Sequence, residues 1–194
     1  MKTFALAAAF AMASTAGYAA DTYTLDASHS QVVFNYNHLG FSTTYGMFSG
    51  FEGEISYDEA DPAASAVTVS MPVKSMFTGW EERTAHFMSP DFFAAEDGDM
   101  VTFTSTGIEI TGDTTAKITG DLSMNDVTKS VVLDAQLNKA ETHPMAGTPW
   151  LGFNATTTLL RSDFGLGAYA PVIGDEVEVF ISVEAQKAEQ VLSQ

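Results

Sequence analysis

Apolar and polar residues alternate with a period of two along most of the chain. In the run 65–73, for example, Val67, Val69, Met71 and Val73 share one face. Successive side chains of a strand point to opposite faces, so each such run predicts a strand with one buried and one solvated face. The runs of this kind are 29–38, 47–58, 65–73, 100–111, 116–124, 127–138, 150–161 and 176–186.

Short polar turns, such as Asp61-Pro62 and Gly112-Asp113, join most of these runs and indicate antiparallel pairing. Eight strands either close into one barrel or divide between the two sheets of a sandwich, and alternation is consistent with both. Several runs are longer than the ~6 residues of a usual strand, which favours the barrel. The sequence therefore predicts an all-β fold, an eight-stranded antiparallel β-barrel whose interior is packed with side chains or holds one small ligand.

The alternation stops between Ser75 and Asp99. Thr78 with Glu81 has the spacing of a capping box, and Ser89-Pro90 places a cap residue before a proline at a first helical position. One or two short helices are therefore expected here. The apolar side chains of the segment are Met76, Phe77, Trp80, Phe87, Met88, Phe92 and Phe93. We interpret this segment as a flap over one end of the barrel; the alternative is that these side chains simply fill the core.

The N-terminus has the features of a secretory signal peptide. Lys2 precedes an apolar run from Phe4 to about Ala13, which is too short to span a bilayer. The small residues that follow favour cleavage after Ala19 over cleavage after Ala20. The sequence therefore predicts export, with a signal peptide over 1–19, one barrel domain over 20–188 and a flexible tail over 189–194.

Composition narrows the classes of partner. The chain has 8 basic and 25 acidic residues and a formal net charge of −17. This charge repels nucleic acid and anionic membranes, so we expect neither a nucleic-acid partner nor stable membrane insertion. The chain contains no cysteine, so an exported domain of this size must be stabilised by packing rather than by disulfides.

Four stretches form one recognisable pattern: YTLDASHSQVVFNYNHLGFSTTYGMFSGFEGEISYD, RTAHFMSPDFFAAE, ITGDLSMNDVTKSVVLDAQL and ATTTLLRSDFGLGAYAPVIGDEVEVFISVEA. From about Tyr23 to Ala185, the chain resembles the YceI-like family of bacterial periplasmic proteins. The resemblance implies an extended, lipocalin-like barrel in the periplasm. It also implies a tunnel for a long amphiphilic lipid, such as a polyprenyl quinone or polyprenyl phosphate, bound non-covalently in place of any cofactor. Family members include homodimers, so a second copy of the chain is a candidate partner.

The chain departs from the family at residues that bear on the head group of such a lipid. Many relatives have a basic residue and a glycine where this chain has Asn125-Asp126, and only Arg83 and Arg161 supply a guanidinium. A phosphate head group usually needs several cationic donors or a helix N-terminus. We therefore expect a neutral head group, such as a quinone.

The inner faces of the strands and the flap form the expected ligand site. The residues expected to line it are Phe34, Tyr36, Phe41, Phe48, Phe51, Met71, Phe77, Trp80, Phe87, Phe103 and Phe164. His38 and His86 would hydrogen-bond a ligand carbonyl at the tunnel mouth, and Arg83 and Arg161 would meet a head group. The alternatives are ordinary core packing for each apolar residue and, for Arg161, an ion pair with an acidic neighbour.

Other functional classes have weaker support. The histidines His29, His38, His86 and His143 form no tight ligand pair, so no metal site is predicted. No nucleophile elbow, zinc-protease helix or phosphate-binding loop occurs, so no catalytic residue is assigned. A carrier that holds an isoprenoid lipid, in a stress response, is the favoured function. An enzyme acting on such a lipid and a metal-binding stress protein are the alternatives.

Overall fold

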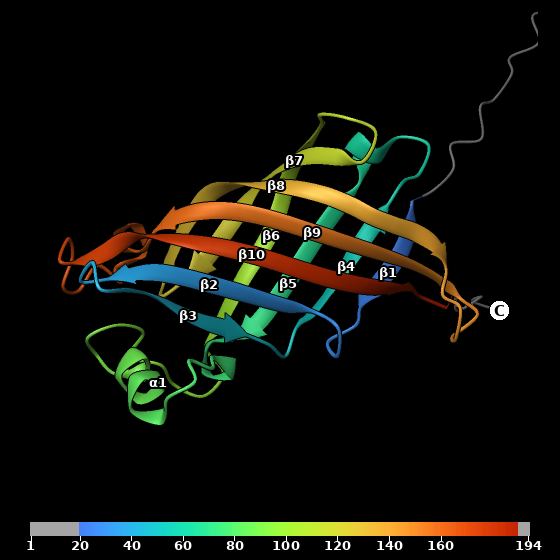
Figure 1. Cartoon of the computed structure of the whole chain (residues 1–194). Coiled ribbons are helices and arrows are strands. Elements are labelled where there is room, and N and C mark those ends of the chain that lie inside the picture. The colour runs from blue at the N-terminus through green and yellow to red at the C-terminus, as the bar shows by residue number, and fades with distance from the viewer. Residues whose placement is uncertain (1–19, 190–194) are drawn as a thin grey trace, which may run out of the picture.

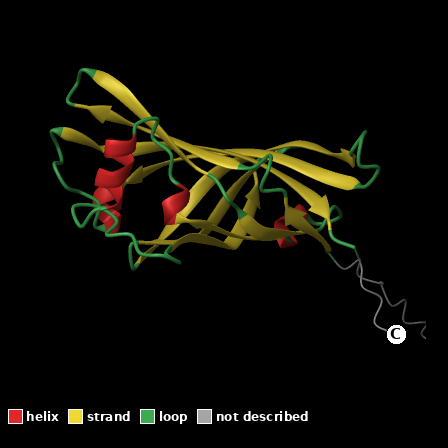
Figure 2. Ribbon diagram, turned by 90° about the horizontal axis from the view of Figure 1, so that it is seen from below, coloured by secondary structure: helices red, strands yellow, loops and turns green. Residues whose placement is uncertain are grey.

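The computed structural model describes residues 20–189, in which ten strands form one sheet wrapped into an elongated barrel (Figure 1, Figure 2). The strands are β1 (Asp21–Leu25), β2 (Gln31–His38), β3 (Ser42–Phe48), β4 (Glu52–Tyr57), β5 (Ala66–Pro72), β6 (Met100–Ile110), β7 (Thr115–Met124), β8 (Val127–Thr142), β9 (Pro149–Leu160) and β10 (Ile173–Lys187). The helix is α1 (Glu81–Met88), and short 3₁₀ helices span Pro62–Ala64, Val73–Ser75 and Arg161–Phe164. The predicted signal peptide and the last five residues of the predicted tail lie outside the described residues.

Eight sheet positions close the barrel. β10 pairs with β9 along one edge, and along its other edge it pairs first with β2 and then with β1. β1 pairs with β4, and the order β4-β5-β6-β7-β8-β9-β10 completes the ring. β1 and β2 therefore occupy one sheet position, as do β3 and β4. The predicted eight-stranded antiparallel barrel is confirmed, with two of its strands each divided in two.

Most of β3 was not predicted. The expected run begins at Met47, whereas the strand begins at Ser42. The first residues of β3 are Ser, Thr, Thr, Tyr and Gly, which show no apolar alternation. Their extended conformation depends on pairing with β2, in which Gly46 lies opposite Phe34. Such pairing is invisible to a local pattern.

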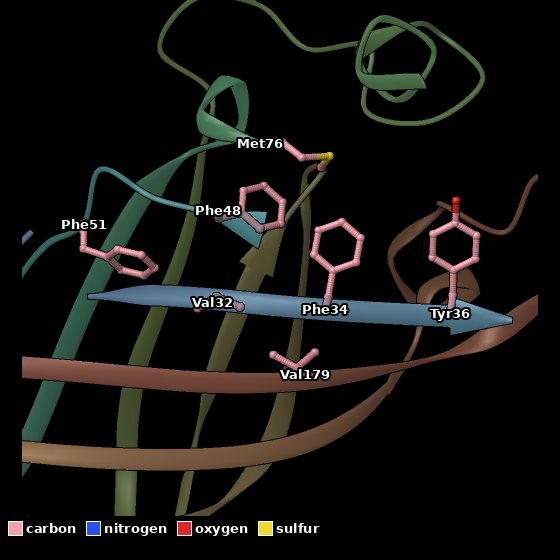
Figure 3. Packing of buried hydrophobic residues seen from close by; sticks show 7 residues of the cluster. All are labelled: Val32, Phe34, Tyr36, Phe48, Phe51, Met76 and Val179. Carbon is pink, nitrogen blue, oxygen red and sulfur yellow. The ribbon is translucent and has the colours of Figure 1, made fainter. Parts of the chain in front are cut away.

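The faces predicted from alternation point into the barrel. One buried cluster, shown in Figure 3, consists of Val32, Phe34, Tyr36, Phe48, Phe51, Met76 and Val179. A second consists of Tyr23, Leu25, Ile55, Leu151 and Ala185. Members of both clusters, such as Phe34 and Ile55, also border an internal cavity. The core residues therefore line the interior rather than filling it.

The segment between β5 and β6 contains the helix α1 and lies beside β3 at one end of the barrel (Figure 1). The predicted capping box is wrong. Trp80 is the N-cap residue and makes no side-chain cap, and the Thr78 hydroxyl instead donates to the Trp80 carbonyl at 3.0 Å. The predicted second helix is a hydrogen-bonded turn, in which the Phe92 N–H donates to the Ser89 carbonyl at 3.0 Å. Among the described residues, no helix has the length and apolar character needed to cross a membrane.

Candidate functional site

The barrel encloses a cavity of about 380 Å³. This volume lies in the range of roughly 300–1,000 Å³ that is typical of pockets for small ligands. All ten strands and the flap contribute to its wall. The wall is formed mainly by the inward-facing apolar side chains that the alternation predicts, such as Val69 of β5, Leu133 of β8 and Val179 of β10. The interior is therefore hollow and apolar.

The cavity is elongated along the barrel. Its wall follows β10 from Ile173 to Val183 and β9 from Phe153 to Arg161. With a rise of ~3.3 Å per residue, the β10 part alone covers roughly 30 Å. This length is close to the ~30 Å thickness of the hydrocarbon core of a bilayer. A cavity of this shape suits a chain-like ligand better than a compact one.

Small side chains from three neighbouring strands keep part of the cavity open. Ala116 of β7 pairs with Ala135 of β8, which pairs in turn with Ala155 of β9. All three alanines border the cavity. A row of methyl groups across three neighbouring strands occupies little of the space that larger side chains would take. The width of the cavity at this level is therefore set by these alanines.

Aromatic side chains close the cavity on the side of the flap. Phe87 of α1 packs against Tyr36 of β2 with ring centroids 6.1 Å apart, and against Phe92 at 5.2 Å. Phe34 and Phe48 pack together at 5.7 Å, beneath the buried thioether of Met76 (Figure 3). Flexible thioethers and aromatic rings adapt readily to an apolar chain. The flap thus supplies part of the cavity wall, as the sequence indicated.

The flap is tied to the loop between β9 and β10. The Tyr169 hydroxyl donates to Oδ2 of Asp91 at 3.2 Å, and Nε2 of His86 lies 3.1 Å from the same oxygen. The negative charge of Asp91 and this hydrogen bond raise the pKa of Tyr169. The Tyr169 ring also contacts His86 at 6.2 Å and Phe92 at 6.1 Å. These contacts hold the flap against the end of the barrel.

The charged residues of the cavity wall lie at its two ends. Asp113, with Thr114 and Thr115, borders the cavity at the β6–β7 turn, and Arg161 borders it where β9 ends. These two positions are at opposite ends of the barrel, because β6 runs away from the flap and ends at the β6–β7 turn, whereas β9 runs toward the flap and ends at Arg161. The wall between them is apolar over most of its length.

Arg161 binds backbone rather than an acidic neighbour. Its Nε donates to the Gly174 carbonyl at 2.8 Å, and Nη2 donates to the Ile173 carbonyl at 3.0 Å. Nη1 donates to the carbonyls of Leu166 and of Ala168, the latter at 2.8 Å. These bonds use four of the five donors of a guanidinium. Arg161 therefore holds the β9–β10 loop in place and has little capacity left for a ligand head group.

The expected ion pair of Arg161 is correspondingly absent among the described residues. The nearby Asp175 instead accepts hydrogen bonds from the Ser162 N–H at 2.9 Å and the Ser162 hydroxyl at 2.6 Å. Burial lowers the pKa of Arg161, opposed by the charges of Asp175 and Tyr36. The carbonyl dipoles around the guanidinium replace the carboxylate that the sequence suggested.

Eight of the predicted site residues lie in the cavity wall. These are Phe34, Tyr36, Phe48, Phe51, Met71, Phe87, Phe103 and Arg161. They are available to a ligand, and their role in binding stays a prediction. Except for Phe87, Phe51 and Arg161, they lie within strands on the inward face.

Four predicted aromatic residues lie outside the cavity wall. Phe41, at the β2–β3 turn, is 90% exposed, and Trp80, before α1, is 58% exposed. Phe77 is 62% exposed because its backbone pairs with Met47 and directs the side chain to the outside of the barrel. Phe164, by contrast, is fully buried outside the cavity wall, in the 3₁₀ helix beside the Asn125 side chain. In turns and irregular segments, side-chain direction is set by tertiary contacts.

The predicted polar residues at the mouth also lie outside the wall. His86 is engaged by Asp91, and His38 lies at the end of β2, where it pairs with Ile173. The Arg83 guanidinium lies over the Trp80 ring, with its central carbon 5.9 Å from the ring centroid, and its Nε has no hydrogen-bond partner in the described part of the chain. The structure does not bring these residues together around a ligand position.

Sequence analysis missed several wall residues. Leu166 borders the cavity from the β9–β10 loop, where no periodic pattern exists, and Ile173 borders it from the start of β10, before the predicted run 176–186. Phe92 and Phe93 were expected in the flap but not in the wall. Leu159 could have been found, since it continues the inward alternation of β9.

Asp26, His29 and Glu184 gather at the β1–β2 connection, with potential ligand atoms within 4.8 Å of one another. Nδ1 of His29 lies 2.6 Å from Oδ2 of Asp26, and the Ser28 N–H and hydroxyl both donate to Oδ1. The hydrogen bond with Asp26 raises the pKa of His29. Burial would raise the pKa of Asp26, but the hydrogen bonds from His29 and Ser28 outweigh it and lower that pKa. The cluster is accounted for as a hydrogen-bonded turn.

The sequence model of the YceI-like domain family matches residues 23–185, nearly the whole described part of the chain. A UPF0312 protein of Ectopseudomonas mendocina is 39% identical over 172 residues, which cover 89% of this chain and 88% of the relative. The chain belongs to the YceI-like family.

Solved structures share this YceI-like barrel. The crystal structure of a Campylobacter jejuni YceI protein is 28% identical and superposes with a TM-score of 0.71, covering 79% of this chain and 90% of the other. A polyisoprenoid-binding domain from Saccharophagus degradans has a TM-score of 0.67 at 15% identity, covering 86% of this chain and 98% of the other. The second match shows that the fold is common to both proteins.

Proposed function

We propose that this protein binds and carries a long-chain isoprenoid lipid in the barrel cavity. The observation that carries the proposal is the apolar wall that runs along roughly 30 Å of strand, with its charged residues confined to the ends. Each buried methylene contributes ~0.8 kcal/mol, so a hydrocarbon chain needs no directed polar contact along its length. That the Saccharophagus degradans domain of the same fold is described as polyisoprenoid-binding supports an isoprenoid as the chain.

The head group of this lipid is neutral, such as that of a polyprenyl quinone. Within residues 20–189, Arg161 is the one basic residue of the cavity wall, and its donors are largely taken up by the carbonyls of the β9–β10 loop. A phosphate or pyrophosphate usually requires several free cationic donors or a helix N-terminus. At the other end, Thr114 and Thr115 border the cavity. Their hydroxyl oxygens accept hydrogen bonds from Nε2 of Gln136 at 3.2 Å and from the Thr111 hydroxyl at 3.0 Å, and each hydroxyl keeps a proton that it could donate to a quinone carbonyl.

The protein acts by binding rather than by catalysis. Among the described residues of the cavity wall, Asp113 is the one carboxylate, so no second carboxylate in this part of the chain accompanies it as an acid–base partner. The N-terminal pattern of Lys2 followed by an apolar run supports export, which would place the carrier in the periplasm, between the two membranes that supply and receive lipid. A role of the protein in a stress response would depend on which lipid it carries.

Affinity alone will not identify the ligand. At ~0.8 kcal/mol per methylene, a chain of about forty carbons would give on the order of 30 kcal/mol, above the ceiling of roughly 20 kcal/mol for non-covalent binding. Ordering of the ligand and incomplete enclosure offset part of this free energy. Affinity therefore does not report the length of the chain, and the ligand has to be identified by its mass.

The test is native mass spectrometry of the protein purified from periplasm, followed by organic extraction. We expect one chain-like lipid per protein, recovered unchanged after incubation, and refilling of the delipidated protein by a polyprenyl quinone in preference to a polyprenyl phosphate. A chemically altered lipid would indicate an enzyme. Zinc or copper at unit stoichiometry without lipid would indicate a metal-binding protein, and either result would overturn the proposal.

A further inference from the structure

Two neighbouring loop tips at one end of the barrel expose large apolar side chains. Leu39 and Phe41 in the β2–β3 turn are 43% and 90% exposed, and Tyr169 and Val172 in the β9–β10 loop are 54% and 66% exposed. The tips lie side by side because Ile173, which follows Val172, pairs with the residue before Leu39 (Figure 1).

The backbone holds these side chains out at positions where other residues are usual. Leu39 and Gly40 have φ values of +58° and +74°. A β-turn whose two central residues both have positive φ usually has Asn-Gly at these positions, and a leucine in the left-handed region is uncommon. The turn is well held, because the Gly40 N–H donates to Oδ1 of Asn37 at 2.8 Å and the Phe41 N–H donates to the His38 carbonyl at 3.0 Å. Folding alone would be served as well by a polar residue at Leu39.

The two tips differ in charge from the loops at the opposite end of the barrel. The stretches 38–43 and 164–174, which form the two tips, contain no Asp, Glu, Lys or Arg, although the chain has 25 acidic residues. At the opposite end, the β4–β5 connection carries Asp58, Glu59 and Asp61, and the β6–β7 turn carries Asp113. The two tips are therefore uncharged and apolar, although acidic residues of the flap and of the β7–β8 turn, such as Asp91 and Asp126, lie at the same end of the barrel; the opposite end is acidic in its loops.

The cavity reaches the end of the barrel that carries the two tips. Leu166 and Ile173, at the two sides of the exposed loop, belong to its wall, as does Phe92 of the flap. The exposed Tyr169 ring packs against Phe92, with 6.1 Å between the centroids. The apolar tips are thus continuous with the end of the cavity.

We propose that these two tips, Leu39–Phe41 and 169–172, dock on a lipid bilayer whose head groups carry no net negative charge, and that lipid passes between this bilayer and the cavity there. The inference rests on the proposed function, because a bilayer is the source of a lipid ligand. Leucine and aromatic side chains on uncharged tips insert favourably into the head-group boundary. The nearby Glu81, Glu82 and Asp126 are exposed and would repel an anionic surface.

The proposal is tested with the Leu39→Asn/Phe41→Ser variant of the delipidated protein. Asn tolerates the backbone of position 39, and neither side chain borders the cavity. Met145→Ser is the matched control, since Met145 is 91% exposed at the acidic end. The measurements are co-flotation with phosphatidylcholine vesicles, the rate at which a polyprenyl quinone moves from these vesicles into the protein, and retention of quinone loaded from detergent.

We expect the double variant to float and to take up quinone about tenfold less well than the wild type, because less apolar surface enters the bilayer. Retention of detergent-loaded quinone should be unchanged, and Met145→Ser should match the wild type throughout. Flotation and uptake equal to wild type in the double variant would overturn the docking site, as would an equal loss in Met145→Ser. A change of oligomeric state in the double variant, with vesicle uptake unaffected, would assign the tips to a second copy of the chain. Failure of all variants and of the wild type to retain quinone would instead contradict the proposed function.

Discussion

The Phe34 ring lies directly over the backbone of Gly46, its partner on the neighbouring strand. A Cβ at Gly46 would lie 2.3 Å from Cζ of Phe34. The Phe103 ring lies over Gly120 at the same distance of 2.3 Å from Cβ to Cζ, although Gly120 is a diagonal neighbour whose direct partner is Ser105. In both pairs the absent side chain allows an inward-facing phenylalanine to lie flat against the barrel wall, which leaves space in the centre of the cavity.

Gly46→Ala should therefore destabilise the protein by about 1–3 kcal/mol, the usual cost of overpacking, because the Phe34 ring must move toward the cavity. Chemical denaturation measures this as a lower midpoint. Gly152→Ala is the control, since a Cβ there meets nothing within 4 Å. A similar loss of stability in both variants would show that strand glycine itself, and not the Phe34 contact, is responsible.

Ala135→Phe should block the cavity. Ala135 is at the centre of the row of alanines that keeps the cavity open between β7 and β9. A phenyl ring at this position would occupy the path of a hydrocarbon chain, so we expect the amount of co-purified lipid to fall about tenfold or more. Val132→Phe, on the same strand but 44% exposed on the outside, should retain lipid as the wild type does. Equal lipid content in the two variants would place the ligand elsewhere.

Phe87 and Trp80 should differ in their effect on ligand retention. Phe87 borders the cavity and packs on Tyr36, whereas Trp80 lies outside it and is more than half exposed. Phe87→Ala should shorten the residence of a bound polyprenyl quinone several-fold, while Trp80→Ala should leave it near the wild-type value. Dissociation into excess detergent measures both. A larger effect of Trp80→Ala would mean that the flap rearranges around the ligand.

The pair of Asp26 and His29 should make stability depend on pH. The pKa of His29 is raised above its ordinary value of 6.5, so its contribution is complete below that value and is lost as pH rises through the folded pKa. The pKa of Asp26 is lowered below 3.8, so its contribution is complete above that value and is lost as pH falls through the folded pKa. The pair therefore stabilises most between about pH 4 and pH 6.5.

Asp26→Asn should remove this dependence and return the His29 pKa toward its ordinary value. An NMR titration of the imidazole measures the pKa directly, and thermal unfolding at several pH values measures the stability. The difference in melting temperature between the wild type and Asp26→Asn should be largest between about pH 4 and pH 6.5. An unchanged imidazole titration in the variant would contradict the role of the hydrogen bond.

The strands and their inward faces were predictable, because side-chain direction in a strand is set by a local period of two. Val67, Val69 and Met71 point into the cavity as the alternation indicated. The departures lie where the chain has no period. Phe77 points outward because its backbone pairs with Met47, far away in the sequence, and Leu166 points inward because Arg161 binds the loop carbonyls around it.

The sequence by itself determined an antiparallel barrel with an apolar interior, since alternation and short turns are properties of neighbouring residues. It also determined membership of the YceI-like family through motifs that extend over the chain. Only the tertiary structure decided that the interior is hollow, because free volume depends on how side chains from all strands meet. The row of Ala116, Ala135 and Ala155, and the glycines beneath Phe34 and Phe103, form only when consecutive strands pair in one particular register.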